Sequence, residues 1–311
     1  MTDNANHGFS TRAIHAGQEP DPLTGAVVPP IYQVSTYKQD GVGGLRGGYE
    51  YSRSANPTRT ALESCLASLE GGSRGFAFAS GLAAEDTLLR AVCRPGDHAI
   101  TPNDAYGGTY RLFAKVAEPW GLAHTPVDLA DLDAVRAAVR PGHTKVLWAE
   151  TPTNPMLSIA DITALADIAH AAGAVLVVDN TFGTPYLQNP LSLGADVALH
   201  STTKYCGGHS DVVGGALVTS TAPGAAAYDD LDERIAFHRT QWARWPARWT
   251  RGWCCAGCAP WGCGWTDTAT TPSGSWPSWP TTRELALCST RGWRRTPATR
   301  SPRGRCAASA A

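Results

Sequence analysis

Hydrophobic residues recur at helical spacing in some segments of the chain and form short continuous runs in others. The segment "NPTRTALESCLASLEGG" places Leu62, Leu66 and Leu69 on one face of a helix. Asn56 suits the capping position and Pro57 suits the first turn, and the two glycines at the end suit a helix terminus. We therefore expect a helix that begins at Pro57 and ends at these glycines.

The same alternation continues to about residue 220. Further helices are expected at 81–96, 107–121, 131–140 and 161–172, and strands at "GFAFAS", "HAITP", "LAHTPVD", "KVLWAE", "AVLVVDN", "DVALHST" and "GGALVTS". Strands that alternate with helices of about ten to fifteen residues are typical of parallel βαβ units. Runs such as "AVLVVD" are apolar at successive positions, as in strands that are buried on both faces. The predicted fold is an α/β domain with a mostly parallel sheet flanked by helices.

Polar residues follow several of the predicted strands. Ser80 comes after "FAFA", Glu150 after "VLWA", Asp179 after "VLVV", and the segment 200–204 after "VAL". In open sheets of this kind the ligand binds beyond the carboxyl ends of the strands. These positions therefore predict the place of a binding site.

Lys204 is the first candidate for chemistry, in the stretch "ALHSTTKYCGGHSD". Thr202 and Thr203, with Ser201 before them and Gly207 and Gly208 after, suit a phosphate and a close backbone approach. A lone loop lysine is more often a solvated surface charge. Asp179 changes this estimate, because a buried carboxylate needs a cation or a helix cap, and a pyridinium nitrogen is such a cation. A lysine Schiff base with an aspartate on the ring nitrogen is the recurring protein contribution to pyridoxal phosphate chemistry.

Two further motifs fit the same cofactor. "ASGLAA" places Gly81 and Leu82 where a strand ends and a helix begins, so that their backbone N–H groups can bind an anion. Tyr106 precedes two glycines in "DAYGG". It is either a core tyrosine or an aromatic ring stacked on a flat cofactor.

The composition divides the chain. Its 311 residues, 43% hydrophobic and 17% charged, suit a globular protein. Residues 242–311, however, hold nine of the eleven tryptophans and ten arginines against Asp267 and Glu284. That segment contains no valine, isoleucine, methionine, phenylalanine or lysine. A globular domain needs such aliphatic residues to fill its core, so we expect residues 242–311 to be an aberrant tail of low order.

A frameshift near residue 242 accounts for this composition. Tryptophan and cysteine codons of G+C-rich genes, read one base earlier, become codons for valine, leucine or methionine. A gene segment that encodes an aliphatic-rich sequence would therefore give the composition of residues 242–311 when it is read in the wrong frame. The other interpretation takes the tail at face value: a possible zinc cluster of Cys254, Cys255, Cys258 and Cys263 includes one C-x-x-C spacing, and arginines among tryptophans suit nucleic acid. A zinc fold normally has a second ligand pair at regular spacing, so we expect neither a metal nor a nucleic-acid partner.

Residues 8–241 resemble the Cys/Met-metabolism family of pyridoxal-phosphate enzymes. The motifs that carry the resemblance are "STRAIHAG", "VPPIYQVSTY", "YEYSRSANPTR", "ASGLAA", "DAYGGTYRLF", "ETPTNP", "VVDNTFGTP" and "HSTTKYCGGHSDVVGGALVT". The resemblance implies a PLP-transferase-like fold of type I, with an N-terminal arm at 1–56 that reaches a neighbouring subunit and a PLP-binding domain at 57–241. It also implies a small C-terminal domain, in whose place the tail stands.

The resemblance also implies roles for single residues. Lys204 would form the Schiff base and move protons, Asp179 would pair with the ring nitrogen, and Tyr106 would stack on the ring. The phosphate would be held by Gly81, Leu82, Ser201 and Thr203. Asn154 would lie by the ring oxygen and the substrate carboxylate, and Tyr51 and Arg53 would reach the phosphate of a neighbouring subunit. Leu82 departs from the usual methionine, with little expected effect on a backbone contact.

Within the family, the motifs look most like those of the bacterial cystathionine γ-synthases. The implied reaction is γ-replacement on an O-acylhomoserine by cysteine, which gives cystathionine. A γ-lyase or an O-acylhomoserine sulfhydrylase remains an alternative, and Gly108 argues against methionine γ-lyase. The family's carboxylate-binding arginine has no matching motif in the tail, so a non-catalytic, cofactor-binding product is the alternative class. Small amino acids are the expected substrates. A homo-oligomer in the cytoplasm, without a membrane partner, is the expected state.

Overall fold

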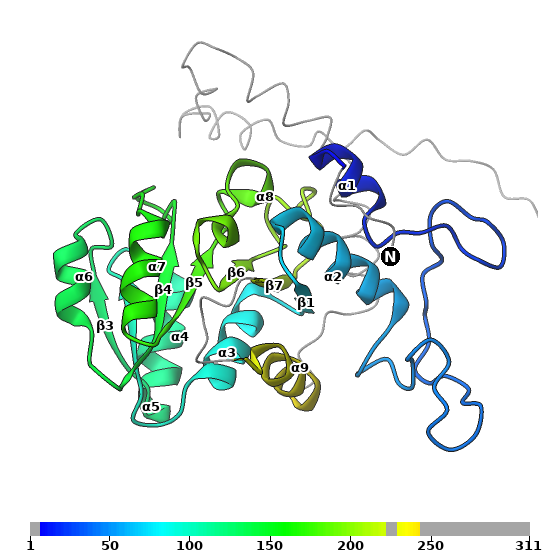
Figure 1. Cartoon of the computed structure of the whole chain (residues 1–311), viewed down its shortest axis with the longest axis horizontal. Helices are drawn as coiled ribbons and strands as arrows, with labels where there is room; N and C mark the ends of the chain where they lie inside the picture. Colours follow the sequence, from blue (N-terminus) through cyan, green and yellow to red (C-terminus); the bar gives the residue numbers. More distant parts are fainter. Residues whose placement is uncertain (1–6, 222–228, 243–311) are drawn as a thin grey trace, which may run out of the picture. The chain divides into compact units, whose positions relative to one another are not determined.

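A seven-stranded sheet forms the centre of the computed structural model, which describes residues 7–221 and 229–242 (Figure 1). The strand order is β1-β7-β6-β5-β4-β2-β3. The strands are β1 Arg74–Phe78, β2 His98–Pro102, β3 Ala123–Val127, β4 Thr144–Glu150, β5 Val175–Asp179, β6 Val197–His200 and β7 Gly215–Thr219. Each predicted strand is present. The frameshift and the candidate zinc cysteines of the tail lie outside the described residues.

The strand β7 runs antiparallel to both of its neighbours, β1 and β6, whereas the other pairs in the sheet are parallel. The predicted mostly parallel sheet is therefore confirmed, with β7 as its exception. A parallel pairing of β6 with β7 would need a crossover connection, usually a helix, but residues 201–214 form no helix. The chain instead turns back at the carboxyl end of β6, and this places Lys204 in the returning loop.

Helices cover both faces of the sheet. One face packs against α1 Phe9–His15, α2 Pro57–Glu70, α6 Leu132–Ala138 and α7 Ile162–Ala171. The other packs against α3 Gly81–Val92, α4 Gly107–Leu112 and α9 Leu231–Gln241. Alternate residues of β5 enter the two cores, Leu176 and Val178 the first and Val175 and Val177 the second. This explains the continuous apolar run of this strand, since both faces are buried.

The helix α2 forms for the reasons that its sequence predicts. The Asn56 side chain accepts a hydrogen bond from the backbone of Thr58 at 3.0 Å, and Pro57 occupies the first turn. Gly71 ends the helix with a φ of 72°, in the left-handed region that glycine adopts without strain. Leu62, with Leu66 and Leu69, is buried against the sheet. Burial of a leucine side chain contributes about 1.5–3 kcal/mol.

The predicted helix 107–121 consists of three consecutive helical pieces. They are α4, a π-helical turn η2 Phe113–Ala117, and α5 Glu118–Trp120. Pro119 has no N–H to donate, and its ring would clash with the carbonyl four residues earlier in a regular helix, which the wider turn relieves. The structure adds α8 Thr184–Leu187, η3 Pro190–Leu193, α1 and α9, which the sequence did not predict as helices.

The predicted N-terminal arm begins with a helix that packs on the chain's own domain. Ala13 of α1 is fully buried, and the Phe9 ring lies edge-on to Tyr186 with centroids 5.1 Å apart. The rest of the arm is mostly exposed and contains Leu23 and Val28. Its role at a neighbouring subunit stays a prediction.

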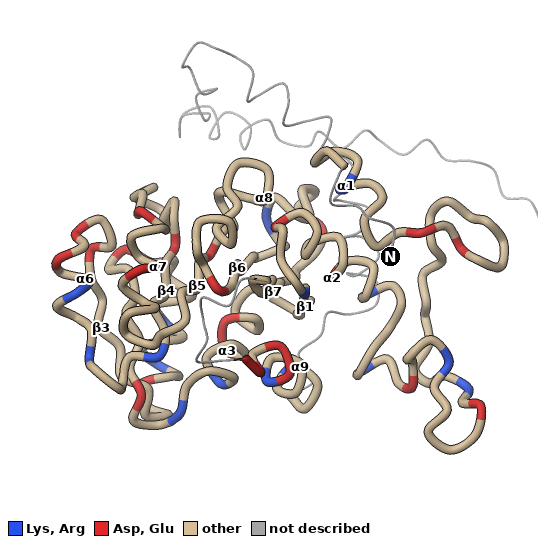
Figure 2. The backbone as a smooth tube through the Cα atoms, in the orientation of Figure 1, with Lys and Arg blue, Asp and Glu red and all other residues tan. Residues whose placement is uncertain are grey.

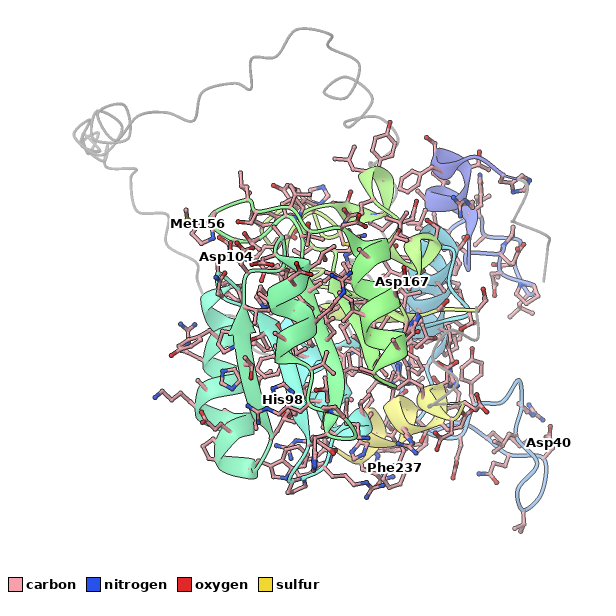
Figure 3. The ribbon with its side chains drawn as sticks, turned by 60° about the vertical axis from the view of Figure 1, so that its left-hand side comes forward. Asp40, His98, Asp104, Met156, Asp167 and Phe237 are labelled. Atoms are coloured by element: carbon pink, nitrogen blue, oxygen red, sulfur yellow. The ribbon has the colours of Figure 1, made fainter. Side chains whose placement is uncertain are left out.

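Acidic and basic residues are interspersed along the described segments (Figure 2). No helix among the described residues is long and apolar enough to cross a membrane. Asp104 and Met156 lie beyond the carboxyl ends of β2 and β4, whereas His98 begins β2 at the opposite edge of the sheet (Figure 3). The polar residues that the sequence placed at strand ends therefore lie at the same edge of the sheet as Asp104.

Candidate active site

A pocket of about 250 Å³ opens at this carboxyl edge of the sheet. Eight of the ten predicted site residues line it, namely Gly81, Leu82, Tyr106, Asn154, Asp179, Ser201, Thr203 and Lys204. They come from the ends of β1, β2, β4, β5 and β6, because these parallel strands all end at one edge. The structure therefore brings residues that are up to 123 positions apart in sequence, as Gly81 and Lys204 are, into one concave site.

One end of the pocket suits an anion. Ser80 caps α3, since its hydroxyl accepts the Ala83 amide at 3.1 Å. The amides of Gly81 and Leu82 stand in the first turn of this helix and have no acceptor within the helix. Ser201 lies close by, because a Cβ added at Gly81 would be 3.2 Å from the Ser201 Cβ. Two backbone donors, a hydroxyl and the positive end of α3 thus converge.

Thr203 also faces the pocket, but its hydroxyl already has partners. It donates to the Gly214 carbonyl at 3.1 Å and accepts the Gly214 amide at 3.0 Å. These bonds close the base of the loop that carries Lys204. The Thr203 hydroxyl could donate to a phosphate only if it gave up its hydrogen bond to the Gly214 carbonyl.

The other end of the pocket is acidic. Asp179 ends β5, and its Oδ1 accepts the Thr181 amide at 3.0 Å. Burial raises the pKa of Asp179, against the opposing effects of Thr181 and His200. Burial and the charge of Asp179 also raise the pKa of Glu85 to about 8 and that of Glu150 to about 7. Three buried carboxyl groups in one pocket favour a cation between them.

Glu150 connects two other predicted residues. Its Oε2 accepts the backbone N–H of Tyr106 at 2.8 Å, and its Oε1 accepts the N–H of Asn154 at 2.8 Å. One carboxylate at the end of β4 therefore fixes the loop after β2 and the loop after its own strand. Tyr106 is 42% exposed and lines the pocket wall.

Lys204 is exposed at the mouth of the pocket. Its backbone is fixed by a bond from its N–H to the Ser201 carbonyl at 3.1 Å and by one from the Gly208 N–H to its own carbonyl at 2.8 Å. Within the described segments its ammonium has no salt-bridge partner. The amine of a lysine without an ion-pair partner is available for a Schiff base with a carbonyl compound.

Tyr51 and Arg53 do not line the pocket of their own chain. The Arg53 guanidinium instead lies over the Tyr51 ring, 5.3 Å from its centroid. Arg59 holds this segment, because its guanidinium donates to the backbone carbonyls of Ser52 and Arg53 at 3.1 and 3.4 Å. Their predicted role at a second subunit's pocket stays a prediction.

The sequence placed Glu150 at the predicted binding edge without assigning it a role, and it did not identify Glu85 as a site residue. The position of Glu150 after a strand was a visible signal, whereas Glu85 lies within the pattern of a helix that carries other charges. The side chain of Glu85 points inward, and Thr109 donates to its Oε1 at 3.2 Å. The side chains of Thr181 and Phe182 also line the pocket.

The pocket fits pyridoxal phosphate. The amides at the start of α3 suit the phosphate, and the carboxyl of Asp179 suits a protonated ring nitrogen. Lys204 places an amine at the same pocket, and no Cβ at Gly81 separates this turn from Ser201. A pocket that is anion-binding at one end and acidic at the other matches a molecule with a phosphate and a pyridinium.

Comparisons with known proteins agree with this chemistry. The model of a family described as Cys/Met metabolism PLP-dependent enzymes matches residues 10–235. The chain belongs to this family. Because the family is PLP-dependent, the predicted cofactor is confirmed, while the roles of the individual residues stay predictions.

Relatives in the family carry several activities. The cystathionine γ-synthase of Mycobacterium tuberculosis is 62% identical over 230 residues, which are 74% of this chain and 57% of that protein. The cystathionine γ-lyase of Bacillus subtilis is 56% identical over 211 residues, 68% of this chain and 55% of that protein. The chain therefore spans little more than half the length of these curated relatives.

A solved structure shares the fold. The crystal structure of metB from Corynebacterium glutamicum superposes with a TM-score of 0.79 at 47% identity, covering 84% of this chain and 66% of that one. At this similarity the predicted PLP-transferase-like fold is confirmed.

Proposed function

We propose that this chain binds pyridoxal phosphate through Lys204 and carries the cofactor domain of a cystathionine γ-synthase. The observation that carries the proposal is the convergence of Lys204, Asp179 and the Gly81 turn on one pocket. The family membership and the γ-synthase relatives support it.

The proposed reaction replaces the acyl group of an O-acylhomoserine with cysteine. The bond between Cγ and the acyl oxygen breaks with its electron pair on the departing carboxylate. The cysteine sulfur then forms a bond with Cγ, and the thiol proton is released. Pyridoxal phosphate, when bound, supplies an electron sink conjugated with the substrate amino group.

The chain's own residues would position and protonate the reactants. Lys204 would bind the cofactor covalently and, once the substrate has displaced it, move protons at Cα and Cβ. Asp179 would keep the ring nitrogen protonated through its buried carboxylate. Tyr106 would cover one face of the ring, and Asn154 would bind the substrate carboxylate.

The proposed enzyme is a homo-oligomer that acts on small amino acids in the cytoplasm. Tyr51 and Arg53 lie outside their own pocket and would contact the phosphate in a neighbouring subunit. A guanidinium suits this role because it donates two parallel hydrogen bonds to phosphate oxygens.

Cofactor binding and turnover can be measured separately on the 311-residue chain. Borohydride reduction after incubation with pyridoxal phosphate, followed by peptide mass spectrometry, locates the modified lysine. The proposal requires the label on Lys204. Label on Lys145 or Lys115 instead, or no label, contradicts it.

Turnover is measured with O-succinylhomoserine and cysteine, and cystathionine is detected by mass spectrometry. Formation of cystathionine supports the synthase. Breakdown of added cystathionine to cysteine, without synthesis, identifies a γ-lyase, and synthesis of homocysteine from sulfide identifies a sulfhydrylase. Label on Lys204 without any turnover identifies a cofactor-binding product that is not an enzyme.

A further inference from the structure

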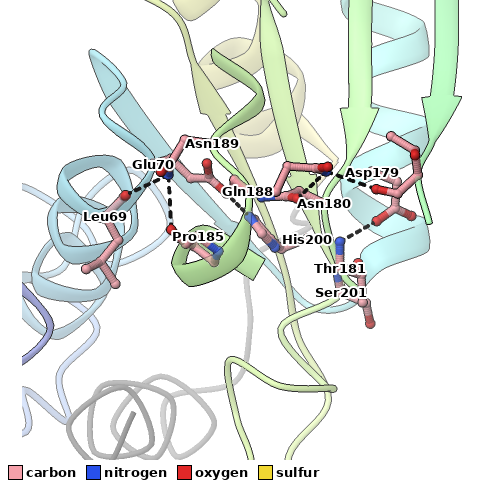
Figure 4. A network of polar contacts seen from close by, with 11 residues as sticks. Leu69, Glu70, Asp179, Asn180, Thr181, Pro185, Gln188, Asn189, His200 and Ser201 are labelled. Atoms are coloured by element: carbon pink, nitrogen blue, oxygen red, sulfur yellow. Dashed lines mark hydrogen bonds and ion pairs between the residues drawn. The ribbon is translucent and has the colours of Figure 1, made fainter. Parts of the chain in front are cut away.

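A buried pair of ionisable residues, Glu70 and His200, lies directly behind the acidic end of the pocket. Glu70 is the last residue of α2 and His200 the last residue of β6, 130 positions apart in sequence. Both side chains are fully buried. The His200 Nε2 is hydrogen-bonded to the Glu70 Oε1 (Figure 4). Neither residue lines the pocket.

The same Glu70 oxygen also binds the strand that carries Asp179. Asn180, the residue after Asp179, donates from Nδ2 to the Glu70 Oε1 at 2.8 Å (Figure 4). The Asn180 side chain is held further by Gln188, whose Nε2 donates to the Asn180 Oδ1 at 2.9 Å. One carboxylate oxygen therefore contacts the residue that follows Asp179 and the residue that precedes Ser201.

The two strand ends are also linked on the pocket side. The Thr181 amide donates to Asp179, and the Thr181 hydroxyl accepts the amide of Ser201 at 2.8 Å. Glu70, on the side away from the pocket, and Thr181, on the pocket side, thus link the ends of β5 and β6. These bonds fix the distance between Asp179, at the ring-nitrogen end of the pocket, and Ser201, at the phosphate end.

The ionisable groups that face His200 are Glu70, Cys206 and Asp179. Burial lowers the pKa of His200, but Cys206 and Glu70 outweigh burial and raise the pKa to about 10. The imidazolium of His200 in turn acts to lower the pKa of Asp179. His200 therefore lies between two acidic side chains, Asp179 at the pocket and Glu70 in the core.

We propose that Glu70 and His200 are positioning residues for the cofactor, which fix the Asp179 carboxylate in orientation and hold it ionised for the ring nitrogen. The inference rests on the proposed binding of pyridoxal phosphate at Asp179. Loss of the pair acts through Asp179: a protonated Asp179 no longer keeps the ring nitrogen protonated.

The chain provides a matched control at the opposite ends of the same two strands. His170 contacts Asp196 at 3.1 Å, and Asp196 accepts the Leu176 amide at 2.7 Å where β5 begins. This pair also joins a histidine to a buried carboxylate and packs on β5 and β6. It does not line the pocket.

The test compares Glu70→Gln and the double variant Glu70→Gln/His200→Gln with His170→Gln and Asp196→Asn, all in the full chain. The dissociation constant of pyridoxal phosphate is measured by absorbance, and the Asp179 carboxyl is titrated by carbon NMR without cofactor. We expect the dissociation constant of pyridoxal phosphate to rise about tenfold in both Glu70 variants, the size of effect found when a residue that orients a binding residue is replaced. In the control variants it should rise by less than about twofold. We also expect the Asp179 titration to move to higher pH in the Glu70 variants.

The double variant is included because a single substitution leaves a buried charge without its partner, which can prevent folding. Parent-like affinity and Asp179 titration in a folded Glu70 variant overturn the inference. If neither variant folds, nitrogen NMR of the parent chain decides: His200 must be doubly protonated at neutral pH and must shift when the cofactor is added, while His170 must not. An unchanged His200 signal overturns the inference. A parent chain that does not bind the cofactor contradicts the proposed function, whereas the cofactor-free Asp179 titration still reports on the pair.

Discussion

Glu150 and Asp179 are register partners at the ends of the neighbouring parallel strands β4 and β5. Their carboxyl groups therefore face one pocket, and each has an altered pKa because it is buried. They serve different partners. Glu150 accepts two backbone amides of the pocket loops, whereas Asp179 accepts the amide of Thr181 and lines the pocket.

Replacement of Glu150 by Gln tests whether this carboxylate holds the loops. In the glutamine side chain an NH₂ group would replace one of the two carboxylate oxygens. It would face a backbone N–H, which is also a donor, so one hydrogen bond would be lost. We expect a loss of about 1–3 kcal/mol in the free energy of unfolding, and weaker cofactor binding because Tyr106 and Asn154 are released. Urea denaturation and absorbance titration measure the two effects. Glu118→Gln, at an exposed position, should change neither; an equal effect there would refute the interpretation.

Replacement of Lys204 by Ala tests the proposed covalent bond. We expect the visible absorbance of the lysine-bound cofactor to disappear, while non-covalent binding at the Gly81 turn and Asp179 persists. Spectroscopy and equilibrium dialysis separate these results. Lys115→Ala, at an exposed position of η2, should behave like the parent chain. A Lys204→Ala chain that still shows the lysine-bound spectrum would exclude Lys204 from the role.

Two adjacent glycines allow a test of the Tyr106 position. A Cβ at Gly108 would lie 2.3 Å from the Tyr106 ring, whereas a Cβ at Gly107 would meet its nearest atom, in Arg111, at 3.4 Å. Alanine in a helix is favoured over glycine by about 0.5–1 kcal/mol, so Gly107→Ala should be neutral or stabilising. Gly108→Ala should displace the ring and weaken cofactor binding. Equal affinities of the two variants would show that Tyr106 does not contact the cofactor.

The stability of the cofactor-free chain should fall as the pH rises, in part through Glu85. Below its ordinary pKa of 4.5 this carboxyl is protonated in both the folded and the unfolded state. Between 4.5 and about 8 the unfolded chain loses the proton while the folded chain retains it, so stability decreases over this range. Urea midpoints at several pH values measure the decrease. Glu85→Gln should show a smaller decrease; an unchanged slope would mean that Glu85 ionises normally.

Mixing two variants tests the proposed sharing of Tyr51 and Arg53 between subunits. Lys204→Ala lacks the amine, and Arg53→Ala lacks the guanidinium. Each should bind the cofactor poorly or non-covalently when alone. Co-expressed, they should form hybrid oligomers with one complete pocket and regain the lysine-bound absorbance. If the mixture equals the average of the two separate variants, each pocket is built from a single chain.

Local patterns in the sequence were sufficient for most of the elements. The cap at Asn56, the proline at the start of α2 and the glycine at its end act within a few residues, so they can be recognised without the fold. The apolar run of β5 reports burial on both faces. The placement of Asp179 at the end of one strand and of Lys204 beyond the end of the next followed from the same patterns, because parallel strands have their carboxyl ends at one edge of the sheet.

Other features depend on contacts between segments that are distant in the chain. The direction of β7 is seen in its antiparallel pairing with β6 and with the distant strand β1, and the strand pattern alone did not give that direction. The inward position of Glu85 depends on Thr109 and on its neighbouring carboxyl groups, and in the sequence it resembles a solvated helix residue. Glu70 likewise lies in an unremarkable position, and no local pattern pairs it with His200. Burial and long-range pairing change the charge and the role of such residues, and both arise only when the chain has folded.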